Sequence, residues 1–139
     1  MVGLILVSHG RMAAGTLEAA RMIVGQQDGV VALALNEGDD VDDLRQHIAA
    51  AISEVDRGDG VLVLVDLFGG SPFNASARPA MARERVEVVS GLNVPMLVEV
   101  LAQRDGSTLQ ELVEVARCAG ASGIRVLSET MDQQSGESA

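Results

Sequence analysis

The chain has 139 residues, 47% of them hydrophobic, and its 20 acidic residues outnumber its 10 basic residues to give a net charge of −10. Length and apolar content predict one globular domain and exclude a disordered main body. All the basic residues are arginine, which excludes Schiff-base chemistry on a lysine and a P-loop lysine, and nucleic-acid binding is not expected of so acidic a chain.

The few chemically distinctive residues narrow the possibilities further. Phe68 and Phe73 are the only aromatic residues, so we expect a core of aliphatic side chains, as in buried parallel strands. Cys118 is the single cysteine, which excludes an internal disulfide and a cysteine-based zinc site, and its helical surroundings predict a small buried side chain. The negative charge serves solubility or attracts a basic partner. The sequence contains no targeting signal and no run of about 20 apolar residues, so we expect a cytoplasmic protein.

Short apolar runs alternate along the chain with segments of helical periodicity. The apolar runs predict strands at residues 3–7, 30–35, 61–65, 86–89 and 123–127. The periodic segments predict helices at residues 16–26, 41–55, 72–81, 95–103 and 108–119. This alternation indicates an α/β fold of three layers, with a doubly wound, mostly parallel sheet between two layers of helices. We expect the domain to span residues 1–128, followed by a polar tail over residues 129–139.

Two residues stand directly after predicted strands, where parallel sheets place their ligands and chemistry. His9 follows the first strand; its position alone is as typical of a nucleophile as of a loop histidine bonded to a backbone carbonyl. Asp66 follows the third strand. If these strands are neighbours, Asp66 accepts a hydrogen bond from one ring nitrogen of His9 and leaves the other nitrogen basic. The alternative for Asp66 is a cap for its own turn.

A third feature, Gly69-Gly70-Ser71-Pro72, lies just beyond Asp66. Its two glycines let backbone N–H groups approach an anion. Ser71 suits the N-cap of the next helix, and the N-terminus of that helix favours phosphate. Alone this turn is weak evidence for a phosphate site. Together with His9 and Asp66, it suits a histidine that is itself phosphorylated. The second histidine, His47, is expected on a solvated helix face, and we expect no metal site.

Three stretches of the sequence resemble one known family. Residues 3–10 (GLILVSHG), 66–74 (DLFGGSPFN) and 91–97 (GLNVPML) are similar to the enzyme IIA component of the mannose family of the bacterial phosphoenolpyruvate-dependent sugar phosphotransferase system (PTS). The similarity covers the predicted domain, residues 1–128. The first two motifs are specific as a pair, whereas either alone is not.

The resemblance implies a phosphotransferase component that works as a phosphocarrier. A phosphoryl group from the phosphocarrier protein HPr is expected to rest on His9, with Asp66 orienting the ring and Gly69, Gly70 and Ser71 stabilising the phosphate. It then passes to a IIB component for sugar uptake, with no cofactor and with only indirect association with the membrane transporter components. The family fold further implies a homodimer, in which a last antiparallel strand, here residues 124–127, is exchanged between subunits.

Other assignments stay open beside this one. The phosphodonor subunit of dihydroxyacetone kinase begins with a related domain, and a regulatory phosphoprotein sensed by a partner would carry the same site. Histidine phosphatases need an arginine where Ser8 stands, and tetrapyrrole chelatases need further metal-directed side chains. Some IIA members have a threonine hydroxyl after the aspartate, which Leu67 lacks. No IIB domain follows in this sequence, so we expect the acceptor to be another polypeptide.

Overall fold

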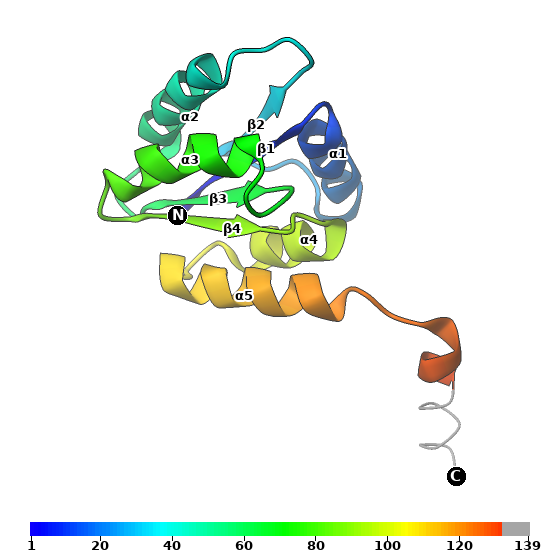
Figure 1. The fold of residues 1–139 in the computed structure, drawn as a ribbon. Helices are drawn as coiled ribbons and strands as arrows, with labels where there is room; N and C mark the ends of the chain where they lie inside the picture. Colours follow the sequence, from blue (N-terminus) through cyan, green and yellow to red (C-terminus); the bar gives the residue numbers. More distant parts are fainter. Residues whose placement is uncertain (132–139) are drawn as a thin grey trace.

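The computed structural model of the protein describes residues 1–131 (Figure 1). Its strands are β1 (Gly3–His9), β2 (Val30–Leu35), β3 (Val61–Val65) and β4 (Val86–Ser90). Its helices are α1 (Met12–Val24), α2 (Val41–Val55), α3 (Ser71–Met81), α4 (Val94–Gln103) and α5 (Leu109–Ser122). None of the helices within residues 1–131 combines the length and hydropathy that crossing a membrane requires.

The four strands form one parallel sheet in the order β2-β1-β3-β4. The chain starts at β1, winds outward to β2, and then returns to the other side of β1 to form β3 and β4. The point where the winding direction reverses lies between β1 and β3, and their register pairs Val7 with Val65. The structure therefore confirms the predicted α/β, doubly wound fold, and it places the carboxyl ends of β1 and β3 side by side at the switch point.

Two apolar clusters, one on each face of the sheet, hold the three layers together. Helices α1, α4 and α5 cover one face and helices α2 and α3 cover the other (Figure 1). Alternate residues of β1 serve the two clusters, since Leu6 packs in the first and Ile5 in the second. Both are fully buried, and burying a side chain of this kind stabilises the fold by about 1.5–3 kcal/mol. This two-sided burial explains the continuous apolar runs.

The starts of two helices differ from the prediction. Helix α1 begins at Met12 rather than at residue 16, because the Oγ of Ser8 accepts a hydrogen bond from the backbone N–H of Ala13 and so stabilises an earlier first turn. The expectation that Ser71 is the N-cap of α3 is wrong. Gly70 is extended and occupies the cap position, and Ser71 is the first helical residue.

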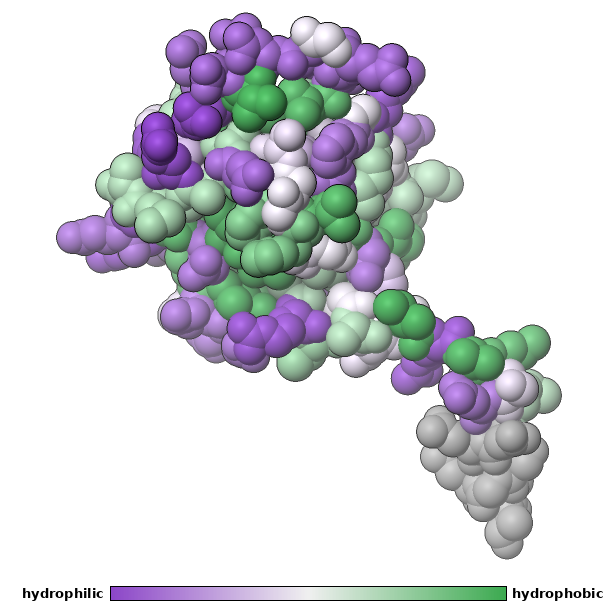
Figure 2. All heavy atoms as spheres, in the orientation of Figure 1, coloured by the Kyte–Doolittle hydropathy of each residue, from purple (hydrophilic) through white to green (hydrophobic). Residues whose placement is uncertain are grey.

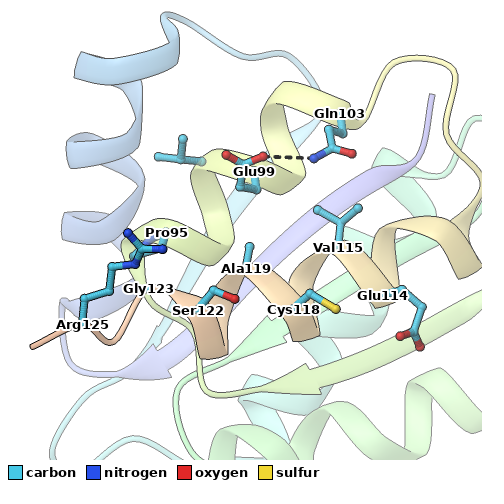
Figure 3. A pocket seen from close by; sticks show the side chains of 11 residues that line it. Pro95, Glu99, Gln103, Glu114, Val115, Cys118, Ala119, Ser122, Gly123 and Arg125 are labelled. Atoms are coloured by element: carbon cyan, nitrogen blue, oxygen red, sulfur yellow. Dashed lines mark hydrogen bonds between the residues drawn. The ribbon is translucent and has the colours of Figure 1, made fainter. Parts of the chain in front are cut away.

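Cys118 is exposed, which corrects the prediction of a small buried side chain. The buried positions of α5 are Leu112, Val113, Ala116 and Gly120, and Cys118 falls on the other side of the helix. There it lines a shallow groove of about 660 Å³ between α4 and α5 (Figure 3).

The predicted last strand is not formed within the single chain. Residues 124–126 are irregular and residues 127–131 form one helical turn. This segment leaves the body of the molecule and carries exposed apolar side chains, with Ile124 82% and Leu127 77% exposed (Figures 1 and 2). A strand needs a second backbone to bond with, and the segment points away from the chain's own sheet. Most of the predicted polar tail, residues 132–139, lies outside the described residues.

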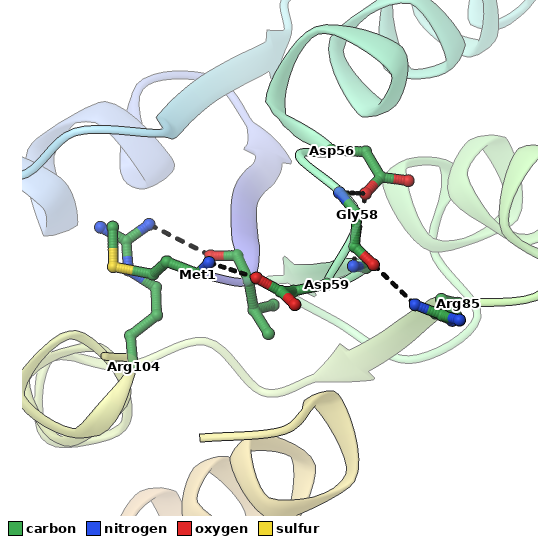
Figure 4. A network of polar contacts seen from close by, with 8 residues as sticks. Met1, Asp56, Gly58, Asp59, Arg85 and Arg104 are labelled. Carbon is green, nitrogen blue, oxygen red and sulfur yellow. Dashed lines mark hydrogen bonds and ion pairs between the residues drawn. The ribbon is translucent and has the colours of Figure 1, made fainter. Parts of the chain in front are cut away.

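A buried arginine closes the opposite end of the sheet. Arg104 follows α4 and is 1% exposed, and its guanidinium donates to the carbonyl oxygens of Asp28 at 2.5 Å, Gly29 at 3.2 Å and Val2 at 3.4 Å. Figure 4 shows its side chain reaching toward the backbone beside Met1. Burial lowers the pKa of the Arg104 guanidinium, and the nearby carboxylate of Asp28 opposes that shift. The group stays cationic at neutral pH because the ordinary pKa of arginine lies far above 7.

Candidate functional site

His9 and Asp66 are in direct contact at the switch point of the sheet. The Nδ1 atom of His9 lies 2.8 Å from Oδ2 of Asp66, and the backbone N–H of His9 donates to the same oxygen over 2.8 Å. The side chain of Asp66 is 13% exposed, whereas that of His9 is 51% exposed. The carboxylate is therefore enclosed, and the ring reaches from it toward solvent.

The contact defines which ring nitrogen is free. An ionised carboxylate only accepts hydrogen bonds, so in the neutral imidazole this contact selects the tautomer with the proton on Nδ1 and the lone pair on Nε2. The other carboxylate oxygen of Asp66, Oδ1, is buried and has no hydrogen-bond partner among the described residues. The free-energy cost of burying this carboxylate is therefore offset by two hydrogen bonds, both accepted by Oδ2 and both donated by His9.

The turn after β1 fixes the position from which His9 projects. Gly10 has a φ of +54°, a conformation that glycine adopts without strain. Its N–H donates to the carbonyl oxygen of Leu35 at the end of β2, over 2.8 Å. His9 is therefore held from both sides of β1: Asp66, directly after β3, bonds it on one side, and the end of β2 holds the turn on the other.

The glycine-rich turn lies directly against the ring. A Cβ atom added to Gly70 would stand 3.1 Å from Cε1 of His9, which is tighter than side chains normally pack, so glycine permits this approach. Gly69 has a φ of +79° in the left-handed region. Ser71 then starts α3, whose first-turn N–H groups have no partner within the helix and favour an anion.

Two further contacts, which were not predicted from the sequence, support this turn. The amide of Asn74 donates to the carbonyl oxygen of Gly69 over 3.2 Å, one turn into α3. The rings of Phe68 and Phe73 lie with their centroids 4.7 Å apart, at an interplanar angle of 51°. Both pairs join the turn to the helix that follows it. For the second pair, the closeness in sequence of the chain's two aromatic residues is a signal that could have indicated the contact.

The surroundings of the ring are open on the side of β2. A hollow of about 700 Å³ lies between His9 and Gly10 and the loop from Leu35 to Asp39. His47 is exposed on α2, as predicted, and it is not part of this site. Within residues 1–131, no group of three or more histidine, cysteine or acidic side chains is placed to hold a metal ion.

The fold and the site together define a class: a doubly wound α/β protein with a half-exposed histidine, bonded to an aspartate and bordered by a glycine-rich turn, at its switch point. Comparison with known proteins identifies the family. The model for the "PTS system fructose IIA component" family, EIIA-man, matches residues 3–117. The chain belongs to this mannose-type enzyme IIA family, which confirms the resemblance seen in the sequence.

Individual relatives agree with this assignment. The chain is 37% identical over 127 residues to the PTS system mannose-specific EIIAB component of Escherichia coli, covering 91% of this chain but only 39% of that protein. It is 29% identical over 133 residues to the PTS system fructose-specific EIIA component of Bacillus subtilis, covering 96% and 91% of the two chains. A phosphotransferase system component EIIA from Streptococcus agalactiae has a similar structure, with a TM-score of 0.85, 30% identity and coverage of 93% and 99%.

Proposed function

We propose that the protein is a phosphocarrier of a sugar phosphotransferase system, which takes a phosphoryl group from phospho-HPr onto His9 and passes it to a IIB component. The observation that carries the proposal is the 2.8 Å contact between His9 Nδ1 and Asp66 Oδ2 at the switch point of an EIIA-family fold. A nitrogen held in this way has its partner nitrogen, Nε2, free to act as a nucleophile.

The transfer step follows from this geometry. The lone pair of Nε2 attacks the phosphorus atom of phospho-HPr, an N–P bond forms, and the P–N bond of the donor breaks with its electron pair returning to the donor imidazole. The His9 ring becomes cationic because it keeps its Nδ1 proton. Asp66, at hydrogen-bond distance from that proton, stabilises the cation. Transfer to the IIB component is the same step with His9 as the leaving group.

The turn beside the ring has the chemistry to hold the phosphoryl oxygens. Gly70 approaches the ring closely, and the backbone N–H groups at the start of α3 favour negative charge. The Ser71 hydroxyl supplies a further donor from the first residue of that helix. Leu67 leaves no hydroxyl at the next position along from Asp66, so the proposed phosphate contacts come from Gly69, Gly70 and Ser71.

The same proposal includes a homodimer in which residues 124–127 of each chain form a strand on the other. Strand β4 pairs with β3 on one edge, and a hollow of about 760 Å³ lies along its other side, between β4 and α5. The exposed apolar side chains of residues 124–131 would be buried there, and the open sheet edge would be paired. We place the domain boundary at residue 128, and we expect any association with the membrane to run through the transporter components.

Incubation with phosphoenolpyruvate, enzyme I and HPr, followed by mass spectrometry under mild alkaline conditions, tests the proposal. One acid-labile phosphoryl group is expected on His9, and its loss is expected when a IIB component is added. His47→Ala is the matched control, because this second histidine is exposed and lies outside the site. Labelling that persists in His9→Ala would refute the assignment.

A further inference from the structure

A buried hydroxyl next to His9 has no part in the mechanism described so far. Ser8 is the residue before His9 and its exposed fraction is 0%. Its Oγ accepts a hydrogen bond from the backbone N–H of Ala13 over 2.7 Å, and it donates to the carbonyl oxygen of Gly10 over 3.3 Å. One hydroxyl thus joins the end of β1, the turn that carries His9, and the first turn of α1.

Among residues 1–131, no other side chain caps this helix. The residue at the N-cap position of α1, Arg11, makes no capping hydrogen bond with its side chain. Ser8 accepts from the N–H of Ala13, which has no partner within the helix, although Ser8 stands before the turn that leads into α1. The turn is therefore fastened at Ser8 to α1, at Gly10 to β2 and at His9 to Asp66.

We infer that Ser8 is a positioning residue for phosphoryl transfer, whose hydroxyl holds the turn so that Nδ1 of His9 stays on Asp66 and Nε2 faces outward. The inference rests on the proposed function. Because Ser8 is fully buried, its side chain cannot contact a phosphodonor or an acceptor. Any effect of Ser8 on the chemical step must therefore pass through His9, which distinguishes it from residues of a docking surface.

Removing the hydroxyl has two consequences at the turn. The N–H of Ala13 and the carbonyl of Gly10 both lose their partner, so the link between the turn and α1 is broken. The ring of His9 then leaves Asp66 for part of the time, and the tautomer with the proton on Nε2 becomes populated. In that tautomer the outward nitrogen has no lone pair to attack phosphorus.

The test compares Ser8→Ala with two other variants. We expect Ser8→Ala to lower the transfer rate at saturating phospho-HPr by about 10-fold, the scale of other residues that orient a reactive group through hydrogen bonds, with little change in KM. Ser8→Thr keeps a hydroxyl and is expected to recover most of the rate. Thr16→Val is the matched control, because the Thr16 hydroxyl donates to the carbonyl of Met12 within the same helix and does not touch the turn.

Nitrogen-15 NMR of the His9 ring gives a readout that does not depend on phosphorylation. The parental protein is expected to show a protonated Nδ1 and an unprotonated Nε2, and Ser8→Ala a mixture of tautomers. Should Ser8→Ala fold poorly, Ser8→Cys fills the same space with a weak hydrogen-bonding group and is expected to show the same change to a smaller degree.

Each outcome separates this inference from the proposed function. An unchanged rate and an unchanged tautomer in Ser8→Ala would overturn the positioning role, and so would an equal loss of rate in Thr16→Val. A parental protein that takes no phosphoryl group on His9 would overturn the proposed function, while the tautomer measurement would still decide whether Ser8 orients the ring.

Discussion

The Oδ2 atom of Asp66 accepts two hydrogen bonds from one residue, His9: one from its backbone N–H and one from its ring, each 2.8 Å long. The backbone bond fixes where the residue stands, and the ring bond fixes how the imidazole is rotated. A single carboxylate oxygen thus determines both the position and the tautomer of the proposed nucleophile. Phosphoryl transfer should therefore respond to small chemical changes at Asp66.

Asp66→Asn tests this sensitivity. The amide keeps the size of the side chain and one oxygen, but it lacks the charge and presents an NH2 group that cannot accept from the ring. We expect the rate of phosphorylation of His9 to fall by about 10–100-fold, with the far-UV circular dichroism spectrum unchanged. A folded variant that accepts phosphate from HPr at the parental rate would reduce Asp66 to a turn residue.

Gly70→Ala tests the close approach of the glycine-rich turn to the ring. The new Cβ would stand 3.1 Å from Cε1 of His9, so either the ring or the turn must move. The backbone of Gly70 is extended, with φ −75° and ψ 172°, and alanine adopts this without strain, so the change acts through the ring contact. We expect a loss of transfer rate of about 10-fold, on the scale of misplaced orienting groups, and little change in Tm.

Gly15→Ala is the matched control for this substitution. Gly15 lies inside α1, and a Cβ added there meets nothing within 4 Å. Alanine in a helix interior stabilises it by roughly 0.5–1 kcal/mol relative to glycine. The control is therefore expected to raise Tm slightly and leave the rate alone, and a similar loss of rate in both variants would contradict the proposed contact.

The assembly is tested at the segment that leaves the body of the chain. A double change, Ile124→Asp with Leu127→Asp, removes the apolar side chains proposed to lie on a second copy. We expect sedimentation to show about twice 14.5 kDa for the parental chain and 14.5 kDa for the variant. Met22→Asp, at a residue of α1 that is 86% exposed, is the control and is expected to remain dimeric. A monomeric parental chain at micromolar concentration would rule out the exchanged strand.

Arg104→Ala tests the buried arginine at the far end of the sheet. The guanidinium is 1% exposed and donates to three backbone carbonyls, each of which would lose this donor. We expect a loss of about 3 kcal/mol in the free energy of unfolding, measured by urea denaturation. Arg45→Ala removes an exposed ion pair with Asp42 and is expected to cost at most about 1 kcal/mol. Equal losses in the free energy of unfolding of the two variants would contradict a structural role for Arg104.

Much of the fold was predictable because its signals are local. Uninterrupted apolar runs such as residues 61–65 occur where both faces of a strand are buried, and steps of three and four mark the helices between them. The contact of His9 with Asp66 was predictable for a topological reason, since the carboxyl ends of neighbouring parallel strands meet at one edge of the sheet.

The features that the sequence did not reveal depend on contacts between distant groups or on helical phase. The early start of α1 depends on Ser8, which precedes the turn at Gly10 and therefore lies several residues before the usual N-cap position. The exposure of Cys118 depends on which side of α5 faces the sheet. A shift of one residue in the assumed helical phase rotates that side by about 100°. The absence of a strand at residues 124–127 depends on what stands beside the segment, which a single sequence does not specify.

The pairing of Phe68 with Phe73 has a practical consequence for spectroscopy. The chain has no tryptophan and no tyrosine, so it is nearly silent in near-ultraviolet fluorescence. Phe68 is 74% exposed and belongs to the same turn as Gly69 and Gly70. A Phe68→Trp substitution would therefore introduce one fluorophore, in the turn proposed to hold the phosphoryl group. Its emission would report changes in that turn without background from other tryptophan or tyrosine side chains.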